Sequence, residues 1–408
     1  MSWHNSTLGD LAKLDGGLIQ TGPFGSQLHQ SEYEAEGIPV VMPKDITDGR
    51  ISVESVARVS EQTANRLQRH MLKPRSIVLP RRGEVTKRAY IREDQDGWLC
   101  GTGCLKIELN GEHLVPEYLY YFMEQGHVTQ WLLQHAVGTT MLNLSAGIVA
   151  ALPIRYPTVE VQNAIADTLA TYDDLIENNR RRMALLEESA RLLYREWFVR
   201  LRFPGYEHTL VVDGVPQGWE RKTLGELTSF LKRGMTPTYD DEVEGLVINQ
   251  KCIRDGRVNL ELARHQSKPV KPERVLQIGD VLVNSTGEGT LGRVAQVKIP
   301  LSNCTVDTHV TIVRPKEGIG RHYFGLAVME WEPRFSTMGK GATNQTELSP
   351  AAIGNTVIVT PSHTLLEQFE LFAEPLYEQV TNLVAQNQKL RAARDLLLPR
   401  LMSGELAV

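Results

Sequence analysis

The stretch TLGDL at residues 7–11 recurs as TLGEL at residues 223–227, and other short stretches recur after it in the same order. KDI at residues 44–46 returns as KCI at residues 251–253, and the offset between matched stretches shrinks along the chain. Chance matches would not keep a common order. The period of about 200 residues is far longer than the roughly 20 to 50 residues of a solenoid repeat, so each copy can bury its own core. We interpret the chain as a tandem duplication.

The composition is that of a soluble globular protein. At 408 residues, with 41% hydrophobic and 23% charged residues, the chain is expected to form two or three domains. No apolar run approaches the roughly 18 residues of a membrane helix, and the polar start does not resemble a signal peptide, so we expect no membrane partner and a cytoplasmic location. The net charge of −5 does not favour coating nucleic acid by bulk charge, although a local basic face remains possible.

A change of hydrophobic period predicts two long helices. Short strand-like runs separated by Gly, Pro and Asp dominate residues 38–154, but from Ile165 onward the apolar residues step by four and three, as in a coiled-coil seam. The same steps return from Phe369 onward, and Pro399 disfavours continuation of that second helix. Each seam contains one asparagine, which lowers stability but fixes the register of the pair. The seam positions assigned to the spacer and subunit interface are Ile165, Leu169, Ile176, Asn179, Met183, Leu186, Leu193, Leu376, Val380, Leu383, Asn387, Leu390 and Leu397.

The predicted fold class is α+β, with two strand-rich domains in tandem that are separated by two long helices forming an antiparallel coiled coil. The acid pairs on the first helix, Asp173-Asp174 and Glu187-Glu188, are expected to lie on a solvated face. The predicted boundaries are 1–157 for the first domain, 158–198 for the first helix, 199–218 for a linker, 219–361 for the second domain, 362–402 for the second helix and 403–408 for a tail.

Motifs for catalysis are missing from the sequence. GEGTLG at residues 287–292 has the spacing of a dinucleotide fingerprint, but RVAQVKI at residues 293–299 alternates like a strand, so we predict a glycine-rich hairpin. HExxH, GxSxG, a Walker A lysine in context and zinc-ligand spacing are all lacking. The four cysteines form no Cys-x-x-Cys pair and are expected to be reduced packing residues. The sequence therefore predicts no catalytic residue, no metal site and no cofactor in this chain.

Two loops in each copy have the chemistry of a nucleic-acid surface. Residues 81–88 hold four cationic side chains in eight positions, and residues 138–143 are rich in small, amide and hydroxyl side chains, as are residues 339–346 in the second copy. Arg and Lys bind phosphate or guanine, while Asn and Gln can pair with adenine. A solvated loop can have the same composition, so only the placement of these loops side by side distinguishes the two interpretations. The candidate DNA-binding residues are Lys44, Arg81, Arg82, Lys87, Arg88, Thr139, Thr140 and Asn143 in the first copy and Asn249, Lys251, Asn284, Ser285, Thr286, Arg293, Lys340, Thr343, Asn344 and Gln345 in the second.

Three stretches resemble the specificity subunits of type I restriction-modification enzymes. LRAARDLLLPRLMSGEL at residues 390–406 is similar to the chain end of that family, and TGPFGSQL at residues 21–28, followed by GIPV at residues 37–40, is similar to an opening of its recognition domains. LIENN at residues 175–179 is also similar. Together with the duplication, the resemblance covers nearly the whole chain.

The resemblance implies two target recognition domains, each reading one half of a split, asymmetric site in double-stranded DNA, with a gap set by the helices. The seam from residue 165 to residue 193 spans roughly 42 Å, compared with about 34 to 36 Å for one turn of DNA. Chemistry is implied for partners: two modification subunits that bind S-adenosylmethionine and methylate adenine, and restriction subunits that use ATP and magnesium. Trp197 and Phe198 are expected to be exposed at such an interface. The second copy has KRGMTP at residues 232–237 in place of the first opening, so the two halves should differ.

Two other interpretations remain open. The chain can be a coiled-coil scaffold whose globular domains bind proteins, in which case the basic residues would be scattered and not gathered beside the polar loops. It can also be a methyltransferase or nuclease in its own right, although an Asn/Asp-Pro-Pro-aromatic motif is lacking.

Overall fold

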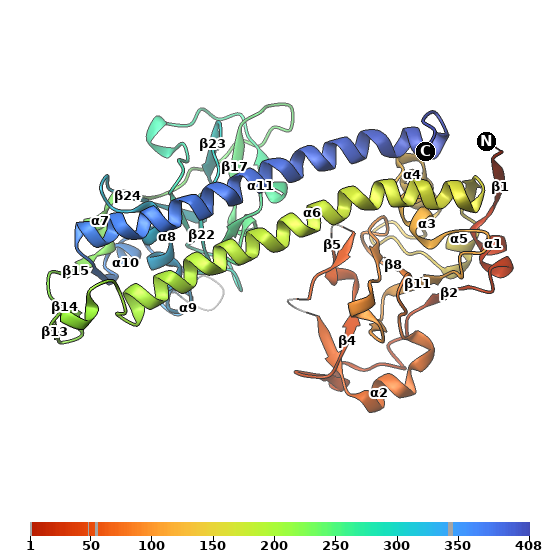
Figure 1. Cartoon of the computed structure of the whole chain (residues 1–408), viewed down its shortest axis with the longest axis horizontal. Helices are drawn as coiled ribbons and strands as arrows, with labels where there is room; N and C mark the ends of the chain where they lie inside the picture. Colours follow the sequence, from red (N-terminus) through yellow and green to blue (C-terminus); the bar gives the residue numbers. More distant parts are fainter. Residues whose placement is uncertain (1, 48, 54–55, 342–345) are drawn as a thin grey trace. The chain divides into compact units, whose positions relative to one another are not determined.

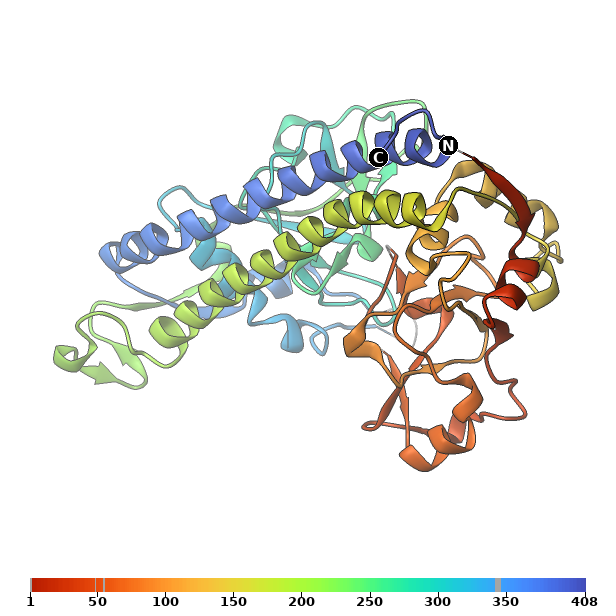
Figure 2. The same cartoon turned by 45° about the vertical axis from the view of Figure 1, so that its right-hand side comes forward.

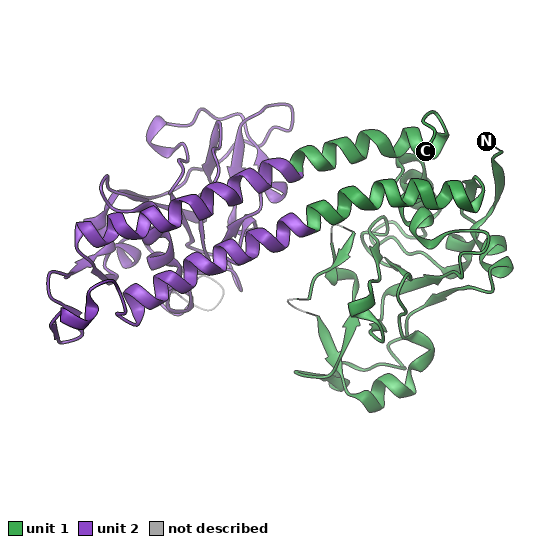
Figure 3. Ribbon diagram, in the orientation of Figure 1, with its two compact units in different colours: residues 1–177, 388–408 green, residues 178–387 purple. Residues whose placement is uncertain are grey.

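The chain forms two compact units (Figure 3). Unit 1 combines the two ends of the sequence, and unit 2 consists of the middle. The computed structural model describes residues 2–47, 49–53, 56–341 and 346–408. Unit 1 comprises Met1–Glu177 and Gln388–Val408, and unit 2 comprises Asn178–Asn387. Each unit therefore contains one globular part and a segment of each long helix.

Unit 1 consists of short strands with short helices between them (Figure 1). Its strands are β1 (His4–Thr7), β2 (Leu18–Thr21), β3 (Tyr33–Glu34), β4 (Ile38–Val41), β5 (Ile46–Thr47), β6 (Arg50–Ile51), β7 (Ala57–Val59), β8 (Ile77–Pro80), β9 (Ala89–Tyr90), β10 (Leu99–Cys100), β11 (Cys104–Glu108) and β12 (Pro153–Tyr156). Its α-helices before the first long helix are α1 (Leu8–Leu14), α2 (Glu61–Arg66), α3 (Pro116–Phe122), α4 (Gly126–His135) and α5 (Ala146–Ala150).

Unit 2 repeats this order of elements. Its strands are β13 (Val211–Val212), β14 (Val215–Pro216), β15 (Glu220–Thr223), β16 (Thr228–Arg233), β17 (Leu246–Ile248), β18 (Ile253–Arg254), β19 (Arg257–Val258), β20 (Arg264–His265), β21 (Val281–Asn284), β22 (Val294–Gln296), β23 (Cys304–Val306), β24 (Val310–Pro315) and β25 (Val357–Thr360). Its short α-helices are α7 (Leu224–Leu227), α8 (Arg321–Met329), α9 (Glu332–Phe335) and α10 (Pro350–Gly354).

The sheets of the two units have matching topologies. The main sheet of unit 1 has the order β2-β11-β8-β9 and that of unit 2 has the order β16-β24-β21-β22, with antiparallel neighbours throughout both. A second sheet contains one parallel pair in each unit, β10 with β4 and β17 with β23. The strand that precedes the first short α-helix of each unit pairs antiparallel with the strand that closes the unit, β1 with β12 and β15 with β25. The predicted duplication and the α+β fold class are confirmed.

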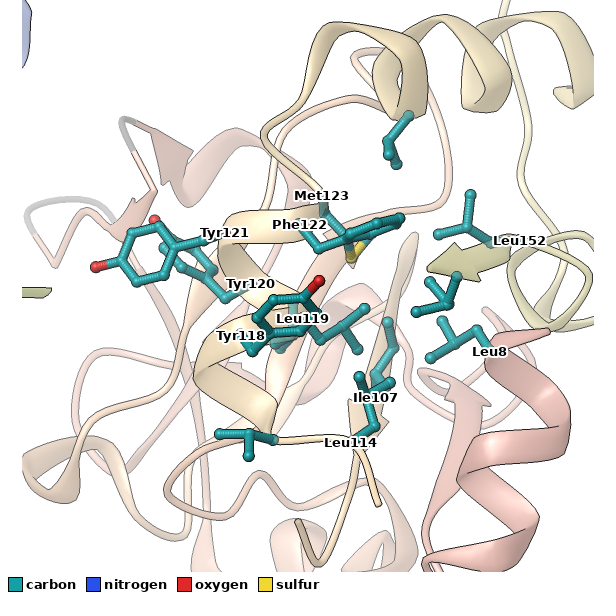
Figure 4. Packing of buried hydrophobic residues seen from close by; sticks show 14 of the residues in the cluster. Leu8, Ile107, Leu114, Tyr118, Leu119, Tyr120, Tyr121, Phe122, Met123 and Leu152 are labelled. Atoms are coloured by element: carbon teal, nitrogen blue, oxygen red, sulfur yellow. The ribbon is translucent and has the colours of Figure 1, made fainter. Parts of the chain in front are cut away.

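The core of unit 1 forms where α3 packs on the main sheet and on α1 (Figure 4). Leu8, Tyr118 and Leu119 are fully buried, and Ile107 of β11 contributes from the sheet. Burying a side chain of this size contributes about 1.5 to 3 kcal/mol. The same cluster includes Leu398 near the end of the chain, so the second long helix completes the core of the first unit.

Two long helices, α6 (Val159–Tyr194) and α11 (His363–Ser403), run side by side in opposite directions within each unit (Figures 1 and 2). In unit 2 the amide of Asn179 donates to Asn387 Oδ1 at 2.9 Å and to Gln386 Oε1 at 3.2 Å. The thirteen seam positions named from the sequence are buried or half-buried. The apolar seam therefore contains one polar layer, whose hydrogen bonds are made in one register only.

Pro399 disfavours continuation of a helix, but α11 continues past it to Ser403. Leu398, Leu401 and Met402 on either side of this proline are buried in the unit 1 core, whereas Pro399 itself is exposed. Tertiary packing of the apolar face outweighs the one hydrogen bond that a proline removes.

Several side chains that are expected on the surface from the sequence are buried in the structure. Trp197 and Phe198, expected at an exposed interface, are only 7% and 9% exposed and pack in the unit 2 core. Glu187, expected on a solvated face, is 9% exposed and forms ion pairs with Arg257 and Lys298. Seam periodicity alone did not show that the globular parts cover these positions.

The four cysteines are buried and free of disulfides, and burial raises the pKa of each thiol. This agrees with the expected role as packing residues. None of the helices in the described ranges has both the length and the apolarity that crossing a membrane requires.

Phe369 tests the packing of α11 on unit 2. The side chain is fully buried against Tyr194, Trp197 and Phe198, so Phe369→Ala should lower the free energy of unfolding of unit 2 by about 3 to 5 kcal/mol. Phe372→Ala, on the same helix but 59% exposed, should cost less than about 1 kcal/mol. Urea unfolding, with hydrogen exchange to assign the affected unit, measures both. Equal losses would contradict the packing described here.

Candidate nucleic-acid interface

In unit 1 the basic loop and the polar loop predicted from the sequence lie side by side. The loop between β8 and β9 pairs with the segment before α5: Leu144 N donates to Arg81 O at 2.8 Å, and Gly83 N donates to Leu142 O at 3.1 Å. Arg82 and Asn143 form an antiparallel bridge between the two segments. Gly83 has a positive φ of 79°, which allows the tight turn at this point. Backbone hydrogen bonds therefore hold the two loops together.

Two further turns meet these loops. Arg81 N donates to Gly103 O at 2.7 Å, and Gly103 lies against the ring of Pro43, next to Lys44. Phe24, in the TGPFGSQL stretch of the first copy, lies under the guanidinium of Arg81. The distance from the centroid of the Phe24 ring to Cζ of Arg81 is 5.3 Å. We name Phe24, Lys44, Arg81, Arg82, Lys87 and residues 139–143 the unit 1 loop surface.

The unit 1 loop surface presents cations and hydroxyl groups to solvent. Arg82, Thr139 and Thr140 are exposed, as is Lys44, whose Nζ lies 3.8 Å from Asp45. Lys87 is partly exposed and pairs with Glu84 on the same loop. The composition that the sequence analysis singled out is thus gathered on one set of neighbouring loops.

Unit 2 repeats this pairing with different side chains. Leu348 N donates to Ser285 O at 2.8 Å, and Thr286 forms an antiparallel bridge with Glu347. These bonds correspond to those of Leu144, Arg82 and Asn143 in unit 1. The loop between β21 and β22 is a hairpin, as predicted from the GEGTLG stretch, because the two strands pair antiparallel.

Other predicted residues of unit 2 adjoin this pair of loops. The side chain of Asn284 donates to Gln250 O at 3.0 Å, which places the turn of Asn249 and Lys251 beside the hairpin. Arg293 donates to Gly289 O at 2.8 Å within the hairpin, and Lys340 forms a bridge with Glu347. We name Asn249, Lys251, Thr286, Arg293, His309, Lys340 and Glu347 the unit 2 loop surface.

The TGPFGSQL stretch of the first copy and the KRGMTP stretch of the second differ in sequence, but each contains a glycine in the same structural position. Gly22 N donates to Cys104 O at 2.9 Å and Gly234 N donates to Val310 O at 3.0 Å, each at the first residue of the corresponding strand. A Cβ atom on either glycine would overlap a backbone oxygen. The openings therefore follow one backbone path but display different side chains after it.

Three of the predicted contact residues are corrected by the structure. Asn284 and Ser285 are fully buried, and their side chains bond within the unit, Asn284 to Gln250 O and Ser285 to Thr311. The side chain of Arg88 is only 11% exposed, and burial lowers its pKa to about 10. Side chains enclosed in this way cannot reach a ligand at the loop surface. Thr343, Asn344 and Gln345 lie outside the described residues.

Arg88 belongs to a half-buried ionic network of unit 1. Its guanidinium lies 2.7 Å from Glu124 Oε1 and donates to Tyr120 O at 3.1 Å. Arg394 of α11 lies 4.0 Å from Glu124 and pairs with Asp173 of α6, which also accepts a hydrogen bond from Tyr121 at 2.8 Å. The end of the basic loop is thereby fixed to α3 and to both long helices.

Sequence reasoning missed His309 and Glu347. Ser285 N donates to His309 O at 2.8 Å, and the Nδ1 atom of His309 lies 2.6 Å from the hydroxyl of Thr286. Neither residue lies in a cationic or amide-rich stretch. The matching of Leu144-Ser145 with Leu348-Ser349 was the one available signal, because it aligns Glu347 with Asn143.

One group of described residues, His322, Glu370 and Glu374, has metal-ligating atoms within 4.8 Å of one another. Each is already engaged within unit 2. Glu370 accepts the backbone N–H groups of His322 and Tyr323 at the start of α8, and Glu374 binds Arg321 and His322. These contacts join α8 to α11, and we assign no ligand to the group.

This chain is similar to known specificity subunits of type I restriction-modification enzymes. The family model for the type I restriction modification DNA specificity domain matches residues 1–188. The chain is 24% identical to the specificity subunit of the type I restriction enzyme MjaIX from Methanocaldococcus jannaschii, over 100% of this chain and 94% of that protein. It is 23% identical to the specificity subunit of the type I restriction enzyme HindI from Haemophilus influenzae, over 78% of this chain and 83% of that protein. The crystal structure of a type I restriction-modification S subunit from M. genitalium has the same fold, with a TM-score of 0.54 at 18% identity, over 98% of this chain and 96% of that one.

Replacing Arg88 tests its assignment to the interior. Arg88→Met leaves Glu124 without its nearest cation, so the free energy of unfolding of unit 1 should fall by about 3 kcal/mol. The exposed neighbour provides the matched control, because Arg82→Met should change stability by no more than about 0.5 kcal/mol. Urea unfolding with hydrogen exchange of unit 1 peptides measures both. A stable Arg88→Met protein with lost DNA binding would return Arg88 to the contact surface.

Proposed function

We propose that this chain, which belongs to the family of type I restriction-modification specificity subunits, reads a split and asymmetric site in double-stranded DNA, with one half for each unit. Members of this family are non-catalytic DNA-recognition subunits of restriction-modification complexes. The observation that carries the proposal is the pair of joined loops that recurs in unit 1 and unit 2 with unlike side chains.

The side chains of each loop surface suit two kinds of DNA contact, one with phosphate and one with bases. Exposed cations, such as Lys44 and Arg82 in unit 1 and Lys251 and Lys340 in unit 2, suit contacts with phosphate, which position a protein on DNA. Hydroxyl and amide side chains beside them, such as Thr139, suit base edges in the major groove. A net charge of −5 does not oppose this role, because binding depends on where the charges lie.

Equivalent backbones with different side chains support two different half-sites. The bridge of Arg82 with Asn143 corresponds to that of Thr286 with Glu347. Unit 1 therefore has a cation and an amide at the two positions where unit 2 has a hydroxyl and a carboxylate. Because the amide of Asn143 and the carboxylate of Glu347 prefer different base edges, the two halves of the site should differ in sequence.

We assign the gap between the two halves to α6 and α11. Their 36 and 41 residues correspond to roughly 54 and 61 Å of helix, enough for half-sites about one DNA turn apart. The buried Asn179–Asn387 hydrogen bond supports a single helix register, and a single register supports a fixed gap.

The remaining activities are assigned to partner subunits. We place S-adenosylmethionine and adenine methylation on two modification subunits, and ATP, magnesium and DNA cleavage on restriction subunits, with the complex working in the cytoplasm. The long helices offer apolar side chains for such partners: Leu185, Leu371 and Leu396 are 69%, 76% and 72% exposed.

Salt dependence tests the phosphate contacts. Arg82→Ala and Lys87→Ala should each weaken binding to all DNA sequences and reduce the slope of log K against log salt by about one, because each removes one phosphate contact. Lys13→Ala is the control, since Lys13 is exposed on α1 near the opposite end of the main sheet. Titration of DNA with the assembled complex at several salt concentrations gives the slopes. Unchanged slopes would remove both residues from the interface.

Lengthening the helices tests their role in setting the gap. Seven residues added to α6 after Glu177 and seven added to α11 after Asn387 keep the Asn179–Asn387 pair and extend the helical pair by about 10 Å, or roughly three base pairs. Selection of bound duplexes from a random pool should then return both half-sites unchanged with a longer gap. Altered half-sites with the original gap would contradict the assignment.

A further inference from the structure

The unit 2 loop surface contains an acidic residue where a surface for DNA is otherwise expected to be basic or neutral. Glu347 lies between two backbone bridges, one to Thr286 of the hairpin and one to Lys340. Asn143 occupies the same place in unit 1, where it bridges Arg82 and Val137. The two residues are therefore equivalent in backbone position, and they differ in that one carries an amide and the other a carboxylate.

The carboxylate of Glu347 is held in place but remains accessible. Its Oε1 atom lies 2.7 Å from the guanidinium of Arg233, and the side chain of Glu347 is 51% exposed, compared with 25% for Arg233. Arg233 also donates to Leu348 O at 3.3 Å, so the cation is fixed to the loop that it supports. Among the described residues, Glu347 Oε2 has no hydrogen-bond partner. One acceptor oxygen is thus oriented and one is left for a ligand.

An exposed carboxylate on this surface is chemically selective. Phosphate repels it, so it cannot serve as a backbone contact. In the major groove, acidic side chains accept a hydrogen bond from the N4 amino group of cytosine, whereas guanine and thymine offer acceptors at the corresponding positions. Adenine also offers an amino group, but its N7 acceptor lies beside that group and repels a carboxylate, so cytosine is the better partner. The ion pair with Arg233 reduces the net negative charge that the loop brings toward DNA.

We propose that Glu347, oriented by Arg233, reads a cytosine in the half-site of unit 2. This inference rests on the proposed function and adds to it the base that one residue selects. Glu347 is the specificity-determining residue, and Arg233 is a positioning residue that acts through it. Lys251 and Lys340, both exposed on the same loop surface, provide phosphate contacts on which this single base contact depends for its placement.

The test compares Glu347→Gln with the wild-type chain in the assembled complex. The change keeps the size of the side chain and removes its charge. Duplexes are selected from a random pool, and the bound sequences give the base preference at every position. We expect the cytosine preference at one position of the unit 2 half-site to fall by roughly 5-fold, because the neutral amide oxygen of Gln accepts a weaker hydrogen bond than a carboxylate, with the unit 1 half-site and the gap unchanged. Glu347→Asp, which keeps both acceptor oxygens, should retain part of the preference.

Two control variants keep the test decisive. Glu317→Gln makes the same chemical change on an exposed residue beyond the opposite end of β24, and it should leave all preferences unchanged. Arg233→Met should weaken the cytosine preference without replacing it by another base, as a positioning residue requires. Melting temperatures of all variants show whether unit 2 stays folded.

The other outcomes overturn the inference in distinguishable ways. Tighter binding to every sequence with an unchanged motif would mean that Glu347 only repels DNA. Weaker binding to every sequence with a lowered melting temperature would mean that Glu347 only holds the loop. If the wild-type complex itself shows no sequence preference, the proposed function fails and not this assignment alone.

Discussion

The architecture of each unit depends on one backbone contact between two loops that are distant in the sequence. Leu144 N to Arg81 O in unit 1 and Leu348 N to Ser285 O in unit 2 have the same length, 2.8 Å. Each joins the hairpin of the main sheet to the segment that leads into a short helix and the closing strand. Because the contact uses backbone atoms alone, it survives sequence divergence between the copies. The side chains around it were free to change, which is what a protein that reads two different half-sites requires.

A second constraint fixes the loops to the long helices through charges that are buried or half-buried. In unit 1, Arg88 at the end of the basic loop binds Glu124, and Arg394 and Asp173 continue the network onto α11 and α6. In unit 2, Glu187 of α6 binds Lys298, which follows β22. A buried ion pair contributes little net stability but is costly to break, so it favours one arrangement of helix and loop.

The periodic and repeated features of this chain could be predicted from the sequence, and the partners of individual side chains could not. The step of four and three from Ile165 predicted α6, and the strand-like residues after Gly292 predicted a hairpin where a nucleotide motif was otherwise suggested. Arg88 looked the same as Arg82 in the sequence, because its partner Glu124 lies 36 residues further along the chain. Trp197 and Glu187 were misplaced for the same reason: the surfaces that cover them come from elements remote in sequence. Glu347 was missed because a lone acid carries no compositional signal.

The central claim is that two equivalent loop surfaces read two unlike sequences at a fixed gap. Single-molecule sequencing can map adenine methylation across the genome of a host that co-expresses the chain with the modification subunit proposed as its partner. We expect one methylated motif in two unlike halves, separated by a constant number of unspecified base pairs. A continuous or palindromic motif, or no methylation despite a stable complex, would contradict the claim.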